Sequence, residues 1–459
     1  MAKNDFLGTQ PIPRLLLQLA MPTVAAQIIN MLYNLVDRIY IGHMAGDGAL
    51  ALTGLGVCMP IILIVTAFAA LTASGGAPRA AIAMGRGEPA EAERILGNCF
   101  SLQIVLSAVL TAALLVWNRP LLLAFGASEN TIGYAVSYMN VYALGTISVQ
   151  LTLGLNAFIT AQGFAKTGMY TVLIGAVCNI VLDPIFIFTF GMGVRGAALA
   201  TILSQTVSAV WVVHFLRGKK TVLHLKKEYF PLRASVILPC IALGAATFVM
   251  QASESVLAVC FNASLLRYGG DIAVGAMTIL TSAVQFAMLP MQGLGQGAMP
   301  ITSYNYGAGN TARVRQSFFV LLRISVCYSL LLWALLMGAP QLFAHIFSND
   351  AALVAFTVKA LRVYAAGLAL FGAQMACQMT FISLGNARAS ITVAVVRKFV
   401  LLIPLIYILP HFLPDPTMAV YMAEPVADIC AVLFTVTLFS FQFRRALREM
   451  AQRPPKAQI

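Results

Sequence analysis

Charged side chains are scarce in this sequence. Asp, Glu, Lys and Arg supply 10% of its 459 residues, whereas ordinary soluble domains contain about 25%. Disordered, fibrous and nucleic-acid-binding proteins need a polar surface that this composition does not provide, so these classes are excluded. Apolar residues supply 60%, more than a soluble fold can bury. The sequence therefore predicts an all-α polytopic membrane protein in contact with the lipid bilayer.

Motifs for metal, disulfide and nucleotide chemistry are missing as well. The eight cysteines occur singly, with no C-x-x-C pair and no clustering with the five histidines. This spacing favours buried structural thiols. No G-x-x-x-x-G-K-[ST] motif occurs, so ATP is not the expected energy source. We predict that the chain is not an enzyme and holds no cofactor.

Twelve apolar stretches remain when the sequence is divided at Gly, Pro and charge clusters, and about 20 residues suffice to cross a bilayer. The predicted transmembrane helices are residues 14–41, 51–76, 95–117, 133–158, 168–190, 196–217, 234–262, 272–298, 316–339, 360–383, 390–411 and 418–441. Most of the 29 Lys and Arg residues, with Arg397 and Lys398 among them, then fall on the side of the two termini. By the positive-inside rule, both termini are predicted to be cytoplasmic.

The most charged interior stretch, residues 217–233, divides the chain near its midpoint into two copies of one pattern. We expect an N-lobe at 1–216, a basic cytoplasmic linker at 217–233, and a C-lobe at 234–459 that ends in a basic tail. An offset of 217, and later of 222, relates the copies: Pro22 to Pro239, Asp37 to Glu254, Gly85 to Gly307, and Val141-Tyr142-Ala143 to Val363-Tyr364-Ala365. Six spans is an even number, so the two pseudo-symmetric six-helix lobes are expected to share one topology around a central cleft.

A polar stripe follows one face of the first predicted helix and recurs on the seventh. Its members are Gln27, Asn30, Asn34 and Asp37, with Gln251 and Glu254 at the matching places of the seventh helix. A charged group at the bilayer centre costs at least about 2.5 kcal/mol, so a carboxylate there indicates function more than packing. For the amides, hydrogen bonding between helices is the alternative. We expect both stripes to face the cleft.

A second polar cluster is predicted from the fifth and sixth helices. Asn179 and Asp183 lie one turn apart, Pro184 removes a backbone hydrogen bond, and Thr201 adds a hydroxyl. With Asp37 they offer two carboxylates, an amide and an alcohol, which suit a hard cation or a shared proton. We predict that these four polar side chains form a cation-coupling site. The choice between H⁺ and Na⁺ stays open, and no other metal is expected.

Further side chains are predicted to line the second half of the cleft, namely Gln285, Met288, Gln292, Gln374 and Gln378. Glu424 and Asp428, one turn apart in the last helix, face either the cleft or an aqueous vestibule. A cleft that is lined by up to three carboxylates, and to which no Lys or Arg is assigned, is expected to prefer cations. Arg38, or the pair Arg397 and Lys398, would weaken this preference by pointing inward.

At these residues the chain resembles the multidrug and toxic compound extrusion family over essentially its whole length. The resemblance rests on Met21-Pro22, Tyr33 to Asp37, Gly75 to Gly87, and Gln292 to Gly309, which contains the specific stretch Pro300-Ile301-Thr302-Ser303-Tyr304-Asn305-Tyr306-Gly307. It implies twelve helices in two lobes, and export of cationic, amphipathic compounds against an inward flow of H⁺ or Na⁺.

The resemblance also implies site residues. Asp37, Asn179, Asp183 and Thr201 match the N-lobe cation site of relatives. Glu254 matches an acid on the seventh helix, but the acid that pairs with it on the tenth helix is absent, and Gln374 and Gln378 lie nearby. Ion coupling is therefore expected in the N-lobe.

We thus expect a monomeric antiporter of the bacterial inner membrane, whose cleft opens alternately to each side and takes small cationic molecules. The nearest alternative is a lipid-linked oligosaccharide flippase of the wider superfamily, which is expected to show extra helices and a cationic cleft. A membrane-embedded enzyme or receptor also stays open, although no catalytic constellation supports it.

Overall fold

The computed structural model describes residues 5–44, 48–347 and 350–452. Lys3, Arg453 and Lys456, three of the basic residues assigned to the side of the termini, lie outside these ranges. In the described ranges the chain forms helices and no strand. The predicted all-α class is therefore confirmed.

The first half of the chain holds eight helices and one π-helical turn. They are α1 (Asp5–Thr9), α2 (Ile12–Gly42), α3 (Gly48–Gly85), α4 (Pro89–Ala124), α5 (Ile132–Leu144), α6 (Thr146–Ala161), α7 (Ala165–Pro184), η1 (Ile185–Thr189) and α8 (Val194–Arg217). Residues 218–233 connect this half to the next and contain one short 3-10 turn, η2 (Lys227–Tyr229).

The second half begins with the longest helix. Its elements are α9 (Ala234–Gly307), α10 (Thr311–Gly338), α11 (Pro340–Phe347), α12 (Ala351–Tyr364), η3 (Ala365–Gly367), α13 (Leu368–Ser383), α14 (Ala387–Val395), the π-helical η4 (Val396–Leu402), α15 (Ile403–Ile408), η5 (Leu409–His411) and α16 (Pro416–Ala451).

Twelve membrane-spanning segments can be counted in the described residues. Ten helices are long and apolar enough to cross a bilayer, and the pair α5 and α6, bent by 58°, makes another span. Helix α9 contains two spans, because Gly270 breaks it with a φ of 66° and a ψ of −163°. Glycine adopts this conformation without the steric cost of a Cβ atom. The twelve predicted helices are thus confirmed.

Several helices run further than the sequence predicts, and α3 and α9 do so where the two lobes meet. The second span is predicted to end at residue 76, but α3 continues to Gly85, and α9 likewise continues past residue 298 to Gly307. Gly75 does not end α3, because it lies where two helices approach closely: a Cβ there would overlap the carbonyl oxygen of Cys240 in α9. Small residues at such crossings allow close packing of membrane helices.

The two lobes touch through reciprocal contacts. A Cβ on Gly85 of α3 would overlap the carbonyl oxygen of Tyr304 in α9, and a Cβ on Gly307 would overlap that of Ile82. Tyr304 and Gly307 each stand 222 positions after Ile82 and Gly85. Contacts that recur with the partners exchanged are the signature of a two-fold axis. The offset found in the sequence is therefore the symmetry that relates the two lobes.

The first helix of each lobe packs into the core of the other lobe. Leu15 and Leu19 of α2 are buried in one cluster with Phe381 of α13. Val236 and Cys240 of α9 are buried with helices of the first half. Helix α2 therefore contacts both lobes.

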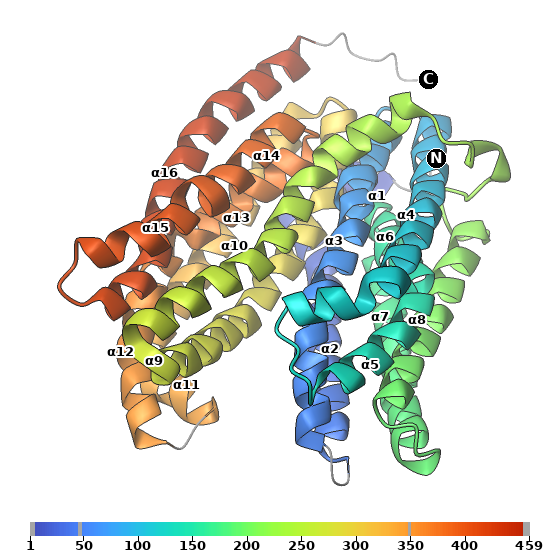
Figure 1. Cartoon of the computed structure of the whole chain (residues 1–459). Helices are drawn as coiled ribbons and strands as arrows, with labels where there is room; N and C mark the ends of the chain where they lie inside the picture. The colour runs from blue at the N-terminus through green and yellow to red at the C-terminus, as the bar shows by residue number, and fades with distance from the viewer. Residues whose placement is uncertain (1–4, 45–47, 348–349, 453–459) are drawn as a thin grey trace.

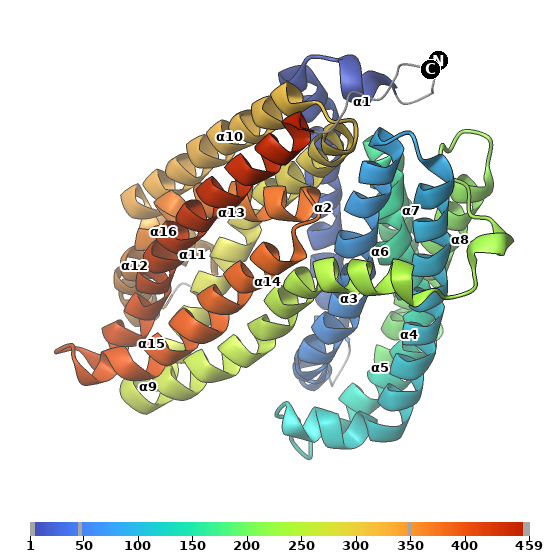
Figure 2. The same cartoon turned by 90° about the horizontal axis from the view of Figure 1, so that it is seen from above.

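The contacts between the lobes gather near one end of the molecule, where α1, the end of α16 and residues 218–233 also lie (Figure 1). They include a ring contact of Phe68 with Phe248, with centroids 4.9 Å apart, and a hydrogen bond from Gln27 Nε2 to Gln296 Oε1 of 3.1 Å. Toward the other end the two groups of helices diverge (Figure 1). Seen from above, they lie side by side with α2 between them (Figure 2).

Candidate functional site

The structure brings the predicted N-lobe acids together inside the protein. Asp37 of α2 is 8% exposed and Asp183 of α7 is fully buried. Helices α2 and α7 pack against each other, and the two carboxyl groups are close enough to interact electrostatically. Asn179, 1% exposed, donates from Nδ2 to Asp183 Oδ1 at 3.2 Å. Two neighbouring carboxylates in a buried site repel each other, which favours a proton or another cation at this pair.

The backbone around Asp183 departs from a regular helix. Helix α7 ends at Pro184, and the π-helical turn η1 follows it. Proline has no backbone N–H, and π-helical turns in membrane and soluble helices are often found at functional sites. The loosened helix expected at Pro184 is thus present, directly beside the buried carboxyl pair.

Thr201 lies on the neighbouring helix α8. Its hydroxyl donates to Ala197 O at 3.0 Å, one turn earlier. Its side chain lies close to that of Tyr138 of α5, which is 4% exposed and also lies near Asp37. Tyr33 of α2 is a second tyrosine close to the carboxyl pair. Sequence reasoning missed both tyrosines, because a single Tyr in an apolar span carries no signal that separates a polar site from core packing.

Three oxygen atoms at this site lack a hydrogen-bond partner within the part of the chain that is described. They are Asp37 Oδ1, Asn179 Oδ1 and Asp183 Oδ2. Burial of a polar atom without a partner costs about 1–3 kcal/mol, so unpartnered acceptors at a buried site indicate a missing donor or cation. Carboxylate and amide oxygens are ligands for hard cations. The site can therefore hold a proton or an oxygen-coordinated cation.

The rest of the α2 stripe lies nearer to the lobe boundary. Gln27 is half-buried and donates to Gln296, as described above. Asn30 is exposed, and its carbonyl oxygen accepts from Asn34 Nδ2 at 2.6 Å. These amides therefore serve in part as hydrogen-bonding groups between and within helices. Arg38, next to Asp37, is exposed.

The C-lobe differs from the N-lobe in the charges that it buries. Arg397 of η4 bonds Asp428 through Nε at 2.8 Å and Glu424 through Nη2 at 3.3 Å. The neighbouring Lys398 bonds Glu254 of α9 at 2.8 Å. Arg397 is 9% exposed and Lys398 is 5% exposed. The prediction that Arg397 and Lys398 belong to the cytoplasmic basic residues is thus wrong. The prediction that no Lys or Arg lies beside the C-lobe acids is wrong as well.

Glu424 and Asp428 are therefore neither free cleft acids nor part of a vestibule. They are 9% and 6% exposed, and both face Arg397. The physical reason is the cost of burying a charge alone: a carboxylate within a membrane helix is stable when a counter-charge or water meets it. Here a guanidinium between two acids supplies that counter-charge.

The two-fold symmetry makes the contrast between the lobes direct. Asp37 and Glu254 occupy equivalent positions on the first helix of each lobe. In the N-lobe the fifth helix presents a carboxylate to this position, Asp183, whereas in the C-lobe the equivalent helix presents an ammonium, Lys398. The N-lobe pair therefore combines two groups of like charge, while the C-lobe pair combines opposite charges.

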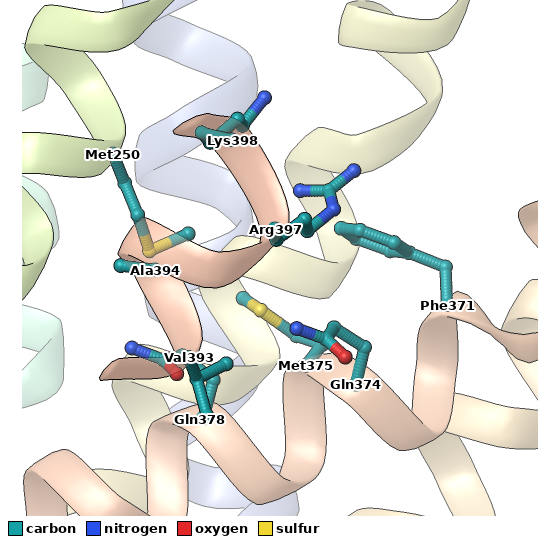
Figure 3. A pocket seen from close by; sticks show the side chains of 9 residues that line it. All are labelled: Met250, Phe371, Gln374, Met375, Gln378, Val393, Ala394, Arg397 and Lys398. Atoms are coloured by element: carbon teal, nitrogen blue, oxygen red, sulfur yellow. The ribbon is translucent and has the colours of Figure 1, made fainter. Parts of the chain in front are cut away.

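A pocket lies beside the C-lobe charges (Figure 3). Its lining side chains are Met250, Phe371, Gln374, Met375, Gln378, Val393, Ala394, Arg397 and Lys398. Of the predicted cleft residues, Gln374 and Gln378 line it. Gln251 follows Met250 in the sequence and is half-buried. Its Oε1 atom has no hydrogen-bond partner among the described residues. The other three residues predicted to line the second half of the cleft are not among the lining residues of this pocket. Gln285 and Gln292 are exposed, and Met288 is packed in the C-lobe hydrophobic core.

Comparison with known proteins gives one family match in each half of the chain. The family described as MatE matches residues 22–185 and again residues 246–408, once in each half. The chain belongs to the MatE family. Each match begins in the first helix of a lobe and ends near its fifth, so the family pattern repeats with the symmetry seen in the fold.

Curated relatives cover nearly the whole chain. The multidrug export protein MepA of Staphylococcus haemolyticus is 23% identical over 430 residues, which are 94% of this chain and 94% of the relative. MepA of Staphylococcus saprophyticus is 24% identical over 427 residues, covering 92% and 93%.

Solved structures show the same fold. The outward-facing conformation of a multidrug resistance MATE family transporter of the MOP superfamily has a TM-score of 0.90 at 23% identity and covers 97% of this chain and 99% of its own. A MOP superfamily transporter from Pyrococcus furiosus, described as having a binding pocket of reverse polarity that suggests a different function, has a TM-score of 0.89 at 23% identity, with 98% and 99% coverage. The two-lobe, twelve-helix fold of this chain is thus the MATE transporter fold.

Proposed function

We propose that this protein is a multidrug-efflux antiporter, which exports cationic amphipathic compounds by alternating access while H⁺ or Na⁺ flows inward. The observation that supports this most strongly is the buried Asp37 and Asp183 pair with its unpartnered oxygens. Two carboxylates in a low-dielectric site repel each other strongly until a cation joins them. Such a site exists to gain and lose one positive charge.

The position of Asp37 connects ion occupancy to the movement of the lobes. The first part of α2 is buried against the C-lobe, and the later part carries Asp37 beside α7. A cation between Asp37 and Asp183 would draw α2 toward α7, and its loss would release α2. Because α2 contacts both lobes, the site can bias which side of the membrane the cleft faces.

The membrane potential can drive this exchange when more positive charge enters than leaves, whereas a one-for-one exchange of monovalent cations relies on the concentration gradient of the ion. One positive charge moving through about 100 mV releases about 2.3 kcal/mol. At about 1.4 kcal/mol per tenfold, this sustains a gradient of roughly fifty-fold for a neutral substrate. The relatives named as multidrug export proteins support efflux as the direction. We propose further that the protein is a monomer in a bacterial inner membrane, with both termini cytoplasmic.

Transport of ethidium into proteoliposomes tests the proposal. Asp37→Asn and Asp183→Asn should each abolish transport driven by a pH or Na⁺ gradient, because a carboxyl group beside a neutral amide loses the like-charge repulsion that a bound cation relieves. Asp271→Asn, the same change at the exposed turn after Gly270, serves as the matched control and should transport like the parent protein. Running each gradient alone identifies the ion. Full gradient-driven transport by both site variants would contradict the proposal, and so would absence of transport by the parent protein with either gradient.

A further inference from the structure

Helix α1 lies at the end of the molecule where the two lobes meet (Figure 1), and two of its consecutive residues contact different lobes. Phe6 packs on the N-lobe: a Cβ at Gly163, in the turn between α6 and α7, would overlap the Phe6 ring. Leu7 is bonded to the C-lobe. Its carbonyl oxygen accepts from Asn305 Nδ2 of α9 at 2.9 Å and from Arg313 Nη2 of α10 at 3.1 Å. Two adjacent residues therefore bridge the lobes.

The attachment of α1 to the C-lobe is a network of hydrogen bonds. Arg313 also donates from Nη2 to Gln10 O at 2.8 Å and from Nε to Asn305 Oδ1 at 2.9 Å. Hydrogen bonds from a guanidinium are charge-assisted, which makes them about twice as strong as those between neutral groups. Apolar contact adds to the network, because a Cβ at Gly8 would lie 3.3 Å from a ring carbon of Tyr304. Helix α1 is thus held firmly to the C-lobe.

The attachment of α1 to the N-lobe is apolar and is made to a well-held turn. Gly163 has a φ of 89°, which favours glycine, and its lack of a side chain leaves room for the ring of Phe6. Gln162, directly before it, is fully buried and accepts three hydrogen bonds from residues 221–223. Van der Waals contacts such as that of Phe6 weaken over short distances, and a gap of about 1 Å forfeits up to about half of their energy. The Phe6 contact therefore depends on the exact position of the N-lobe.

Separation of the lobes at this end requires one of the two attachments to break. Consecutive Cα atoms are about 3.8 Å apart, so Phe6 and Leu7 cannot each follow a different lobe when the lobes part. The attachment of Leu7 includes charge-assisted hydrogen bonds, whereas that of Phe6 is an apolar contact. Helix α1 should therefore leave Gly163 and stay with the C-lobe. The ring of Phe6 then becomes exposed, which opposes the separation.

We propose that α1 is a clasp that keeps the lobes together at this end, with Arg313 fixing it to the C-lobe and Phe6 contacting the N-lobe. The α1 clasp thereby sets the balance between the two orientations of the cleft. On the proposed topology this end is cytoplasmic, so the α1 clasp stabilises the state in which the cleft is closed to the cytoplasm. The inference rests on the alternating access of the proposed function, but a measurement of conformation tests it without transport.

The experiment measures the distance between two spin labels in the purified full-length protein. The labels are attached at Lys166→Cys and Arg388→Cys, two exposed positions near the starts of α7 and α14 that are related by the 222-residue offset. The four cysteines that are not buried are changed to Ser, namely Cys178, Cys260, Cys327 and Cys430. Phe6→Ala should raise the ratio of long to short distances about tenfold over the parent, because the apolar contact with the N-lobe is lost. Arg313→Met should raise it as well, because α1 loses its charge-assisted bonds to the C-lobe.

Arg315→Met is the matched control, because Arg315 is exposed on the same helix two residues later and the change removes the same charge. It should leave the ratio of distances as in the parent. A folded Phe6→Ala protein with the parent ratio would overturn the proposal, whatever Arg313→Met does. An Arg315→Met protein that opens as far as Arg313→Met would overturn it too. Either result leaves gradient-driven ethidium transport and its loss in Asp37→Asn intact, so a failure here is separable from a failure of the proposed function.

Discussion

At the scale of single residues, Arg397 and Lys398 are neighbours in the chain that are held by different counter-charges. Arg397 lies between two nearly buried acids, and Lys398 faces one exposed acid. Both are on the π-helical turn η4, which directs one side chain toward α16 and the next toward α9. Their removal should therefore have very different effects on stability.

Arg397→Met should lower the stability of the folded protein by about 3–5 kcal/mol, since it leaves Glu424 and Asp428 buried without a counter-charge. Lys398→Met should cost less, because it leaves one carboxylate without its counter-charge where Arg397→Met leaves two, and the side chain of that one, Glu254, is half exposed. The apparent thermal midpoint of each purified variant in one detergent is the measurement. Arg397→Met combined with Glu424→Gln and Asp428→Asn should recover most of the loss, because neutral groups then replace the whole buried ion cluster. An Arg397→Met midpoint equal to that of the parent would contradict the role assigned to Arg397.

The two charge clusters also show what the sequence can and cannot predict. Asp37, Asn179 and Asp183 were predictable, because helical spacing places Asn179 and Asp183 on one face and the cost of burial singles out the acids. Arg397 and Lys398 were misplaced, because positive charges near a loop are normally counted with that loop. One signal was available: Lys398 stands eight residues inside the predicted span 390–411, about 12 Å from its end at 1.5 Å per residue, deep enough to need a partner.

At the scale of elements, residues 218–233 are tied to the first half of the chain by three side chains. Gln162 Oε1 accepts from Thr221, Val222 and Leu223 at 2.8–2.9 Å. Asn98 bonds Tyr229 O and the backbone N–H of Arg233. Glu93 pairs with Lys226 at 2.6 Å and raises its pKa, so the lysine stays charged across the physiological range. The connection between the two halves is therefore held against the first half by side-chain hydrogen bonds and an ion pair.

The crossing of α3 with α9 depends on two glycines related by the symmetry. Gly85→Ala and Gly307→Ala should each destabilise the protein by about 1–3 kcal/mol, because the added methyl overlaps a backbone carbonyl that cannot rotate away. The two losses should be similar, and the double variant should lose less than their sum, since the first change already separates the helices. Apparent thermal midpoints measure this.

Gly133→Ala in α5 is the matched control, because no atom lies within 4 Å of a Cβ at that position. It should be neutral or slightly stabilising, since alanine favours a helix by up to about 1 kcal/mol over glycine. Crossing variants that behave like Gly133→Ala would show that the helices separate more easily than their packing indicates.

At the scale of the whole molecule, the fold and its symmetry were predictable from the sequence, whereas the way in which the lobes interlock was not. Span lengths and the 222-residue offset indicate two six-helix lobes. The insertion of α2 and of the first part of α9 into opposite cores depends on contacts between distant residues, such as Leu15 with Phe381, that periodicity along one chain does not encode. Any rocking of the lobes, as the proposed alternating access requires, would therefore have to preserve these shared cores.

Alternating access requires the contacts between α3 and α9 to open at the end where the lobes now meet. Phe68 and Phe248 lie on either side of this boundary, with ring centroids 4.9 Å apart. In a protein with the exposed Cys327 and Cys430 changed to Ser, Phe68→Cys and Phe248→Cys together should accept a short cleavable thiol cross-linker. Gradient-driven ethidium transport should then fall to background and return after the linker is cleaved, because one lobe can no longer move against the other. Each single variant, treated with the same reagent, should keep its transport, which separates the cross-link from the chemical modification. Undiminished transport by fully cross-linked protein would mean that these lobes do not part here, and the opening of the cleft would have to be sought within a single lobe.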